Sequence, residues 1–254
     1  SLSGTADIVK YDFGYEIDPV WEAGNKNIPG IYIEFKEPWL NPKGFEQIVY
    51  DVLANTQDMN IIEKPEPEDT PFYINNGTIN VGNTNGKVIL QTFSLESLVR
   101  VAEVFQGKVP MCFLLWKGTG ATDLTYDDPL GYASFINLGV KYKAHFIGPC
   151  IAGAPNDYPE LDQPWQDYLI HRAKMKNHPY TFDTYDQMAK YFGQYNFGVA
   201  DGMFNPPYLD ALFTNHSDMS INYMITHGWR KSPASQTLVD AREVLRKLGY
   251  LDNN

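Results

Sequence analysis

A carboxylate and an ammonium group two residues apart, Glu34 and Lys36, are the first candidates for chemistry in this 254-residue chain. They lie in the stretch GIYIEFKEPWLNP, residues 30–42, where apolar residues alternate with Tyr32, Glu34 and Lys36. This period of two predicts a β-strand whose polar set shares one face, and Pro38 ends it because proline has no N–H for the ladder. At a strand end the two charges need a metal ion, a substrate or each other. An exposed pair on an edge strand, which contributes little, explains the pattern equally well.

The elements that must position these charges alternate along the chain. Strands are predicted at residues 31–36, 87–93, 109–116, 144–150, 177–182 and 198–204. Helices are predicted at residues 44–53, 94–107, 128–140, 168–173, 183–192, 206–213 and 235–248, with Ser94 and Asp183 as caps and a long loop at 61–86. The alternation favours a parallel sheet with helical crossovers, about two units short of a closed eight-stranded barrel.

Composition narrows the class of partner. The net charge is −11 and no run of Lys or Arg occurs, so nucleic acid and anionic membrane surfaces are not expected partners. No apolar stretch approaches the length of a transmembrane helix. Cys112 and Cys150 are the only cysteines, and we expect two buried free thiols, with a disulfide as the alternative in an oxidising compartment. The start at Ser1, without an apolar leader, predicts a processed product or a fragment.

Further strings follow the first strand in a recognisable order. They are LQTFSLESL at 90–98, FIGPC at 146–150, NHPYTFDTYDQM at 177–188 and GVADGMFNPP at 198–207. Together with GIYIEFKEPW they resemble the glycerophosphodiester phosphodiesterase family, in particular its larger periplasmic members, over residues 10–213. The resemblance implies a TIM barrel that hydrolyses glycerophosphodiesters to an alcohol and glycerol 3-phosphate, with a divalent cation, Ca²⁺ or Mg²⁺.

The resemblance also assigns roles to individual residues. Glu34 would be a metal-binding carboxylate, and Lys36 would be a catalytic contact to the substrate phosphate. Phe93 and Tyr180 would line the pocket, and His178 would reach its mouth as a further catalytic residue. These types suit the chemistry, because a hard cation prefers oxygen ligands and an ammonium adds charge beside the same phosphate oxygens. Core packing is the alternative for the two aromatic residues, and a structural histidine is the alternative for His178.

The chain departs from the family pattern at both ends. No His-Arg-Gly string occurs and no histidine precedes His145, so the family's acid/base pair has no match. The Glu-x-Asp pair that completes the family's metal site is taken to be missing with the other early segments. Residues 204–207 replace the usual Thr-Asp, and residues 214–254 have no counterpart. We therefore predict a (β/α)8 TIM-barrel type domain at 1–213 that lacks its first strands, and a C-terminal helical extension at 214–254.

Three functions follow from these observations. The first is a secreted, extracellular or periplasmic phosphodiesterase of lipid metabolism, whose N-terminal strands lie on a companion chain or are absent from this sequence. The second is a non-catalytic secreted binding or structural protein on a degenerate barrel. The third is a glycoside hydrolase that uses Glu34 with Trp39 and Trp116 as sugar platforms, although no second carboxylate is evident at a strand end.

Overall fold

The computed structural model describes residues 31–36, 38–55, 88–116, 128–156, 160–194 and 209–227. Within these ranges a five-stranded parallel sheet runs in chain order. Its strands are β1 (Ile31–Glu34), β2 (Val88–Thr92), β3 (Met111–Leu115), β4 (Phe146–Pro149) and β5 (Lys176–Asn177). The predicted strand at 198–204, the helix at 235–248 and the loop at 61–86 lie outside the described residues.

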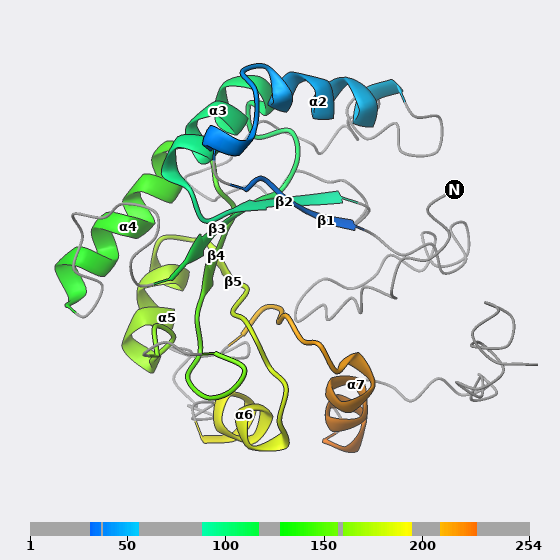
Figure 1. Ribbon diagram of the computed structural model, residues 1–254. Helices are drawn as coiled ribbons and strands as arrows, with labels where there is room; N and C mark the ends of the chain where they lie inside the picture. Colours follow the sequence, from blue (N-terminus) through cyan, green and yellow to red (C-terminus); the bar gives the residue numbers. More distant parts are fainter. Residues whose placement is uncertain are drawn as a thin grey trace, which may run out of the picture. The chain divides into compact units, whose positions relative to one another are not determined.

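Helices connect the strands and cover one side of the sheet (Figure 1). The connecting elements are η1 (Pro38–Leu40), α2 (Phe45–Asn55), α3 (Leu95–Phe105), α4 (Pro129–Lys141) and α5 (Pro164–Arg172). After β5 the chain forms α6 (Tyr185–Ala189), its π-helical continuation η2 (Lys190–Gln194) and α7 (Ser217–Thr226). The chain divides into two compact units, Ser1–Ser220 and Ile221–Asn254, and the whole sheet belongs to the first. The predicted change of domain at residue 213 stays a prediction. Among the described helices none is long and apolar enough to cross a membrane.

Side-chain caps set where several helices begin. The Ser94 hydroxyl accepts a hydrogen bond from the backbone N–H of Ser97, as predicted, at 3.3 Å. The predicted cap at Asp183 is wrong, because Thr184 caps α6 and forms a capping box with Gln187. The Asp183 carboxylate accepts hydrogen bonds from the backbone and side-chain amides of Asn215 instead, at 2.8 Å each.

The helix-facing side of β1 is held by packing and by side-chain hydrogen bonds. Phe35 is buried, with its ring 5.9 Å from that of Phe45 and 6.4 Å from that of Phe105. The Thr92 hydroxyl donates to the Phe35 carbonyl at 2.7 Å, and the Ser97 hydroxyl donates to the Lys36 carbonyl at 2.9 Å. The backbone just after β1 is therefore fixed by β2 and α3, and Phe35 packs against α2 and α3.

The opposite face of the sheet is lined by a second apolar cluster, the inner cluster. It comprises Cys112, Leu114 and Phe146, with Tyr32, Ile89, Phe93 and Tyr180 packed against it. The Tyr32 hydroxyl lies 3.1 Å from Nδ1 of His178, and its ring lies 4.8 Å from that of Phe213. In a flat sheet β1 and β5 would be about 19 Å apart, four strand spacings, so these contacts require strong curvature around the inner cluster. Cys112 and Cys150 are both buried and unpaired, as expected.

Residues 209–213 lie beside β5 and form no helix. The N–H of Asp210 donates to the Asn177 carbonyl at 3.0 Å, and that of Phe213 donates to the Pro179 carbonyl at 3.0 Å. The N–H of Phe182 donates in return to the Phe213 carbonyl at 2.8 Å. The predicted helix at 206–213 is therefore wrong for the part that the structure describes, because these tertiary hydrogen bonds override the local apolar spacing. The predicted strand at 177–182 is regular only in β5, and a single bridge then joins Tyr180 to Cys150.

Packing around Gly148 on the inner face of β4 leaves no room for a side chain. An added Cβ would lie 2.6 Å from Cδ2 of Leu114, 2.9 Å from Sγ of Cys112 and 3.0 Å from the backbone oxygen of His178. We expect Gly148→Ala to lower the free energy of unfolding by about 1–3 kcal/mol, the usual cost of overpacking, measured by urea denaturation. Gly139→Ala is the control, since its closest contacts would be the flexible side-chain ends of Ile147 at 3.2 Å and Met175 at 3.3 Å. The substitution also gains helix propensity. Equal stability of the two variants would contradict the prediction.

Candidate functional site

Glu34 and Lys36 lie together at the carboxyl end of β1, as predicted. Nζ of Lys36 is 2.7 Å from Oε1 of Glu34, and the side chains are 65% and 22% exposed, respectively. Such a half-exposed pair contributes at most about 1 kcal/mol, so its ammonium can leave the carboxylate at little cost. Of the partners that the sequence allowed, each charge has the other.

A side chain that sequence reasoning missed lies next to Glu34. Gln91 on β2 is the register partner of Glu34, so the two side chains share the inner face. Within the described part of the chain, the Oε1 atom of Gln91 is buried and accepts no hydrogen bond. The sequence did contain a signal for it, because Gln91 is a polar residue at an inner position of the strand VILQT, whose first three residues are apolar.

Phe93 and Tyr180 meet at the same end of the sheet. Their ring centroids are 5.6 Å apart and their planes are perpendicular, at 90°. The Tyr180 hydroxyl donates to the Leu115 carbonyl at 2.9 Å, which fixes the ring against β3. Both rings also pack on the inner cluster. The structure therefore brings the two predicted pocket residues together, and their role in binding stays a prediction.

His178 lies inside the inner cluster instead of at the mouth. Its ring stacks on Phe146 with 4.0 Å between centroids, and its Nδ1 is 3.1 Å from the Tyr32 hydroxyl. Burial lowers the pKa of His178 to about 4, so the imidazole is neutral at pH 7. A neutral imidazole in this position can accept a proton, but it cannot act as a general acid.

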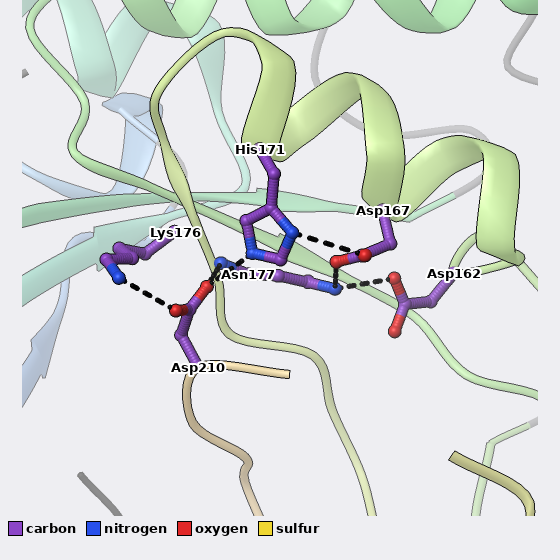
Figure 2. Close-up of polar contacts among 6 residues, drawn as sticks. All are labelled: Asp162, Asp167, His171, Lys176, Asn177 and Asp210. Atoms are coloured by element: carbon purple, nitrogen blue, oxygen red, sulfur yellow. Dashed lines mark hydrogen bonds and ion pairs between the residues drawn. The ribbon is translucent and has the colours of Figure 1, made fainter. Parts of the chain in front are cut away.

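A second polar cluster lies at β5 and α5, shown in Figure 2. We call it the Asp210 network, and it comprises Asp162, Asp167, His171, Lys176, Asn177 and Asp210. The Asp210 carboxylate accepts hydrogen bonds from Nε2 of His171 at 2.7 Å, Nζ of Lys176 at 3.0 Å and the N–H of Asn177 at 2.8 Å. Nδ2 of Asn177 donates to Asp162 at 2.9 Å and to Asp167 at 2.8 Å. Sequence reasoning missed the network because its members come from separate segments.

Charge distribution in the Asp210 network is set by burial and pairing. Burial raises the pKa of Asp162, and the neighbouring Asp167 raises it further. Burial would lower the pKa of His171, but hydrogen bonds to Asp167 and Asp210 raise it to about 10. Burial would raise the pKa of Asp210, but the same histidine and Lys176 hold it below its usual value. His171 and Asp210 therefore form an ion pair that fastens residues 209–213 to α5 and β5, a structural role on the side of β5 that faces α5.

Few groups of the kind that bind metal ions lie near the carboxyl end of β1 in the described part of the chain. Among the described residues, no group of three or more His, Cys, Asp or Glu side chains could hold a metal ion. Glu34 and Gln91 are the oxygen donors on adjacent strands. The early Glu-x-Asp string taken to be missing does occur in the sequence, at Glu16 and Asp18, which lie outside the described residues.

Comparisons with known proteins support the fold. No protein-family profile matches the chain, and no curated protein matches it by sequence. The structure resembles a crystal structure from Silicibacter pomeroyi DSS-3 that is provisionally assigned as a glycerophosphoryl diester phosphodiesterase, with a TM-score of 0.51 and 13% identity. The match covers 85% of this chain and 56% of that protein. At this identity the likeness establishes the fold alone, and the chain has an α/β barrel-type fold.

Proposed function

We propose that this chain is a metal-dependent phosphodiesterase, which hydrolyses small glycerophosphodiesters to an alcohol and glycerol 3-phosphate. The observation that carries the proposal is the position of Glu34 and Lys36 at the carboxyl end of β1 in an α/β barrel-type fold. Active sites of such barrels lie at the carboxyl ends of the strands. A carboxylate and a mobile ammonium in that place suit an anionic substrate held beside a cation.

The donor set at the mouth fits a hard cation. Glu34 and the orphaned oxygen of Gln91 would hold Ca²⁺ or Mg²⁺, which take oxygen ligands and complete their coordination with water and substrate phosphate. When bound, the cation would neutralise charge on the phosphoryl oxygens. Lys36 would then release Glu34 and donate to the same phosphate. Phe93 and Tyr180 would form an apolar wall for the carbon skeleton of the substrate.

The acid/base residues are proposed to come from further strands. His178 is buried and neutral, so it would serve at most as a proton acceptor. The missing strands would lie on a companion chain or in a longer form of this one, secreted to the periplasm or beyond. Exposed apolar side chains on η1 and α2 support this, namely Trp39, Leu40, Ile48 and Val52. A preceding strand and helix of a barrel would pack against α2.

Hydrolysis assays on variants test the proposal. We expect the native preparation to hydrolyse sn-glycero-3-phosphocholine only with added Ca²⁺ or Mg²⁺. Lys36→Met should lower kcat/KM by about 10²–10³, because it removes the donor to the transferring phosphate. The exposed Lys43→Met makes the same change of charge and should leave the rate unchanged. Intact-mass analysis of the same preparation should reveal the companion chain. Hydrolysis that survives Lys36→Met would refute the assignment.

One observation favours a second function, a non-catalytic binding protein. The charges of Glu34 and Lys36 already pair with each other at 2.7 Å, so neither charge needs a metal ion as its partner. A protein of this kind would bind a glycerophosphodiester without cleaving it. Calorimetry would support this function if the glycerophosphodiester binds after all divalent cations have been removed and no hydrolysis product forms.

A further inference from the structure

Among the described residues, none donates a hydrogen bond to the buried Oε1 atom of Gln91 on the inner face of the sheet. Its register partners are Glu34 on β1 and Cys112 on β3. The Cys112 thiol is hydrogen-bonded to Tyr32, so it is already engaged. Along β2 the neighbours on the same face are apolar, Ile89 and Phe93.

Leaving a buried amide oxygen unpaired has a cost. Such a group lacks the hydrogen bonds that water would otherwise donate to it. The ammonium of Lys36 is a donor at the same end of the sheet, but it is bonded to Oε1 of Glu34 at 2.7 Å. The Oε1 atom of Gln91 is thus an unused hydrogen-bond acceptor next to the carboxylate of Glu34. A ligand site without its ligand has such an arrangement.

We propose that Oε1 of Gln91 is a second protein ligand of the divalent cation bound by Glu34, an inference that rests on the proposed function. Adjacent strands are about 4.8 Å apart, and side chains on one face converge further over a concave sheet. Two oxygens that share one Ca²⁺ each lie about 2.3–2.6 Å from it, so adjacent strands can supply both. An amide oxygen contributes no charge, which keeps the site open to an anionic phosphate.

Mn²⁺ binding tests this inference without any measurement of activity. The full chain is titrated with Mn²⁺ by calorimetry and electron paramagnetic resonance, with no substrate present. We expect Gln91→Met, which keeps the volume and removes the oxygen, to weaken Mn²⁺ binding about tenfold, and Gln91→Glu to tighten it about tenfold. Gln47→Glu adds the same charge on the exposed face of α2 and should change the affinity less than about twofold.

The outcomes separate this inference from the proposed function. If Glu34→Gln weakens Mn²⁺ binding but both Gln91 variants match the wild type, the Gln91 ligand is refuted and the role of Glu34 stands. If Glu34→Gln has no effect, the metal site and the inference fail together. If Gln91→Met weakens binding of a glycerophosphodiester and leaves Mn²⁺ binding unchanged, the oxygen accepts from a substrate hydroxyl and the inference is overturned. Circular dichroism confirms that each variant is folded. If Gln91→Met does not fold, Gln91→Glu still tests the inference.

Discussion

Replacing Asp210 with alanine will lower the free energy of unfolding by about 3–5 kcal/mol, the cost of breaking a buried ion pair by removing one partner. The Asp210 carboxylate accepts from His171, Lys176 and the N–H of Asn177, and its side chain is almost fully buried. Without it, the His171 imidazolium loses one of its two carboxylate partners, and the Asn177 N–H loses its acceptor. Residues 209–213 also lose the side chain that ties them to α5.

Urea denaturation followed by circular dichroism measures this loss. Asp51→Ala is the matched control, because Asp51 is exposed on α2 and bonds to the side chain of Gln47 one turn away. We expect that control to change stability by less than about 0.5 kcal/mol. Asp210→Asn should fall between the two, since it keeps one acceptor oxygen. A loss below about 1 kcal/mol for Asp210→Ala would show that the network carries little of the fold's stability.

Raising the pH from 6.5 towards 10 will destabilise the protein. The pKa of His171 is 6.5 when unfolded and about 10 when folded, so above pH 6.5 the folded state holds a proton that the unfolded state has lost. The stabilisation is therefore complete below pH 6.5 and disappears as the pH rises through about 10. The raised pKa values of Asp162 and Asp167 act in the same direction from their unfolded value of 3.8 upward. One proton gives a slope of at most about 1.4 kcal/mol per pH unit, and solvent screening at the 32% exposed His171 side chain reduces it.

Urea midpoints at a series of pH values between 6 and 10 check this expectation. The His171→Gln variant should be less stable at pH 6.5, and its alkaline decline should be flatter. His216→Gln, at an exposed histidine in the segment before α7, should retain the wild-type slope. A stability that stays level from pH 6.5 to 9.5 would mean that His171 is not charged in the folded protein.

Local patterns predicted much of this fold. Alternation in GIYIEF and the apolar run at 109–116 located β1 and β3, and the Ser94 cap marked the start of α3. These features depend on neighbours along the chain, which the sequence displays directly. The same alternation correctly placed Glu34 and Lys36 on one face at the end of a strand.

Features that depend on register and on distant partners could not be predicted. Gln91 became a candidate ligand only because the register aligns it with Glu34 on another strand. Residues 209–213 have helical apolar spacing, but hydrogen bonds to Asn177 and Pro179 and the donors around Asp210 hold them beside β5 in a non-helical conformation. His178 lies in a string that resembles the family, but its burial inside the inner cluster follows from the curvature of the whole sheet.

The contacts of Tyr32 constrain the order in which the chain can fold. Tyr32 is separated from His178 by 146 positions, and it also touches Phe213, still further along the chain. During synthesis β1 therefore leaves the ribosome long before His178 and Phe213 exist. Such non-local closure slows folding, since the entropy of a long loop is lost before its contacts form. The contacts of Tyr32 with these two residues can form only when almost the whole of the first unit has been made.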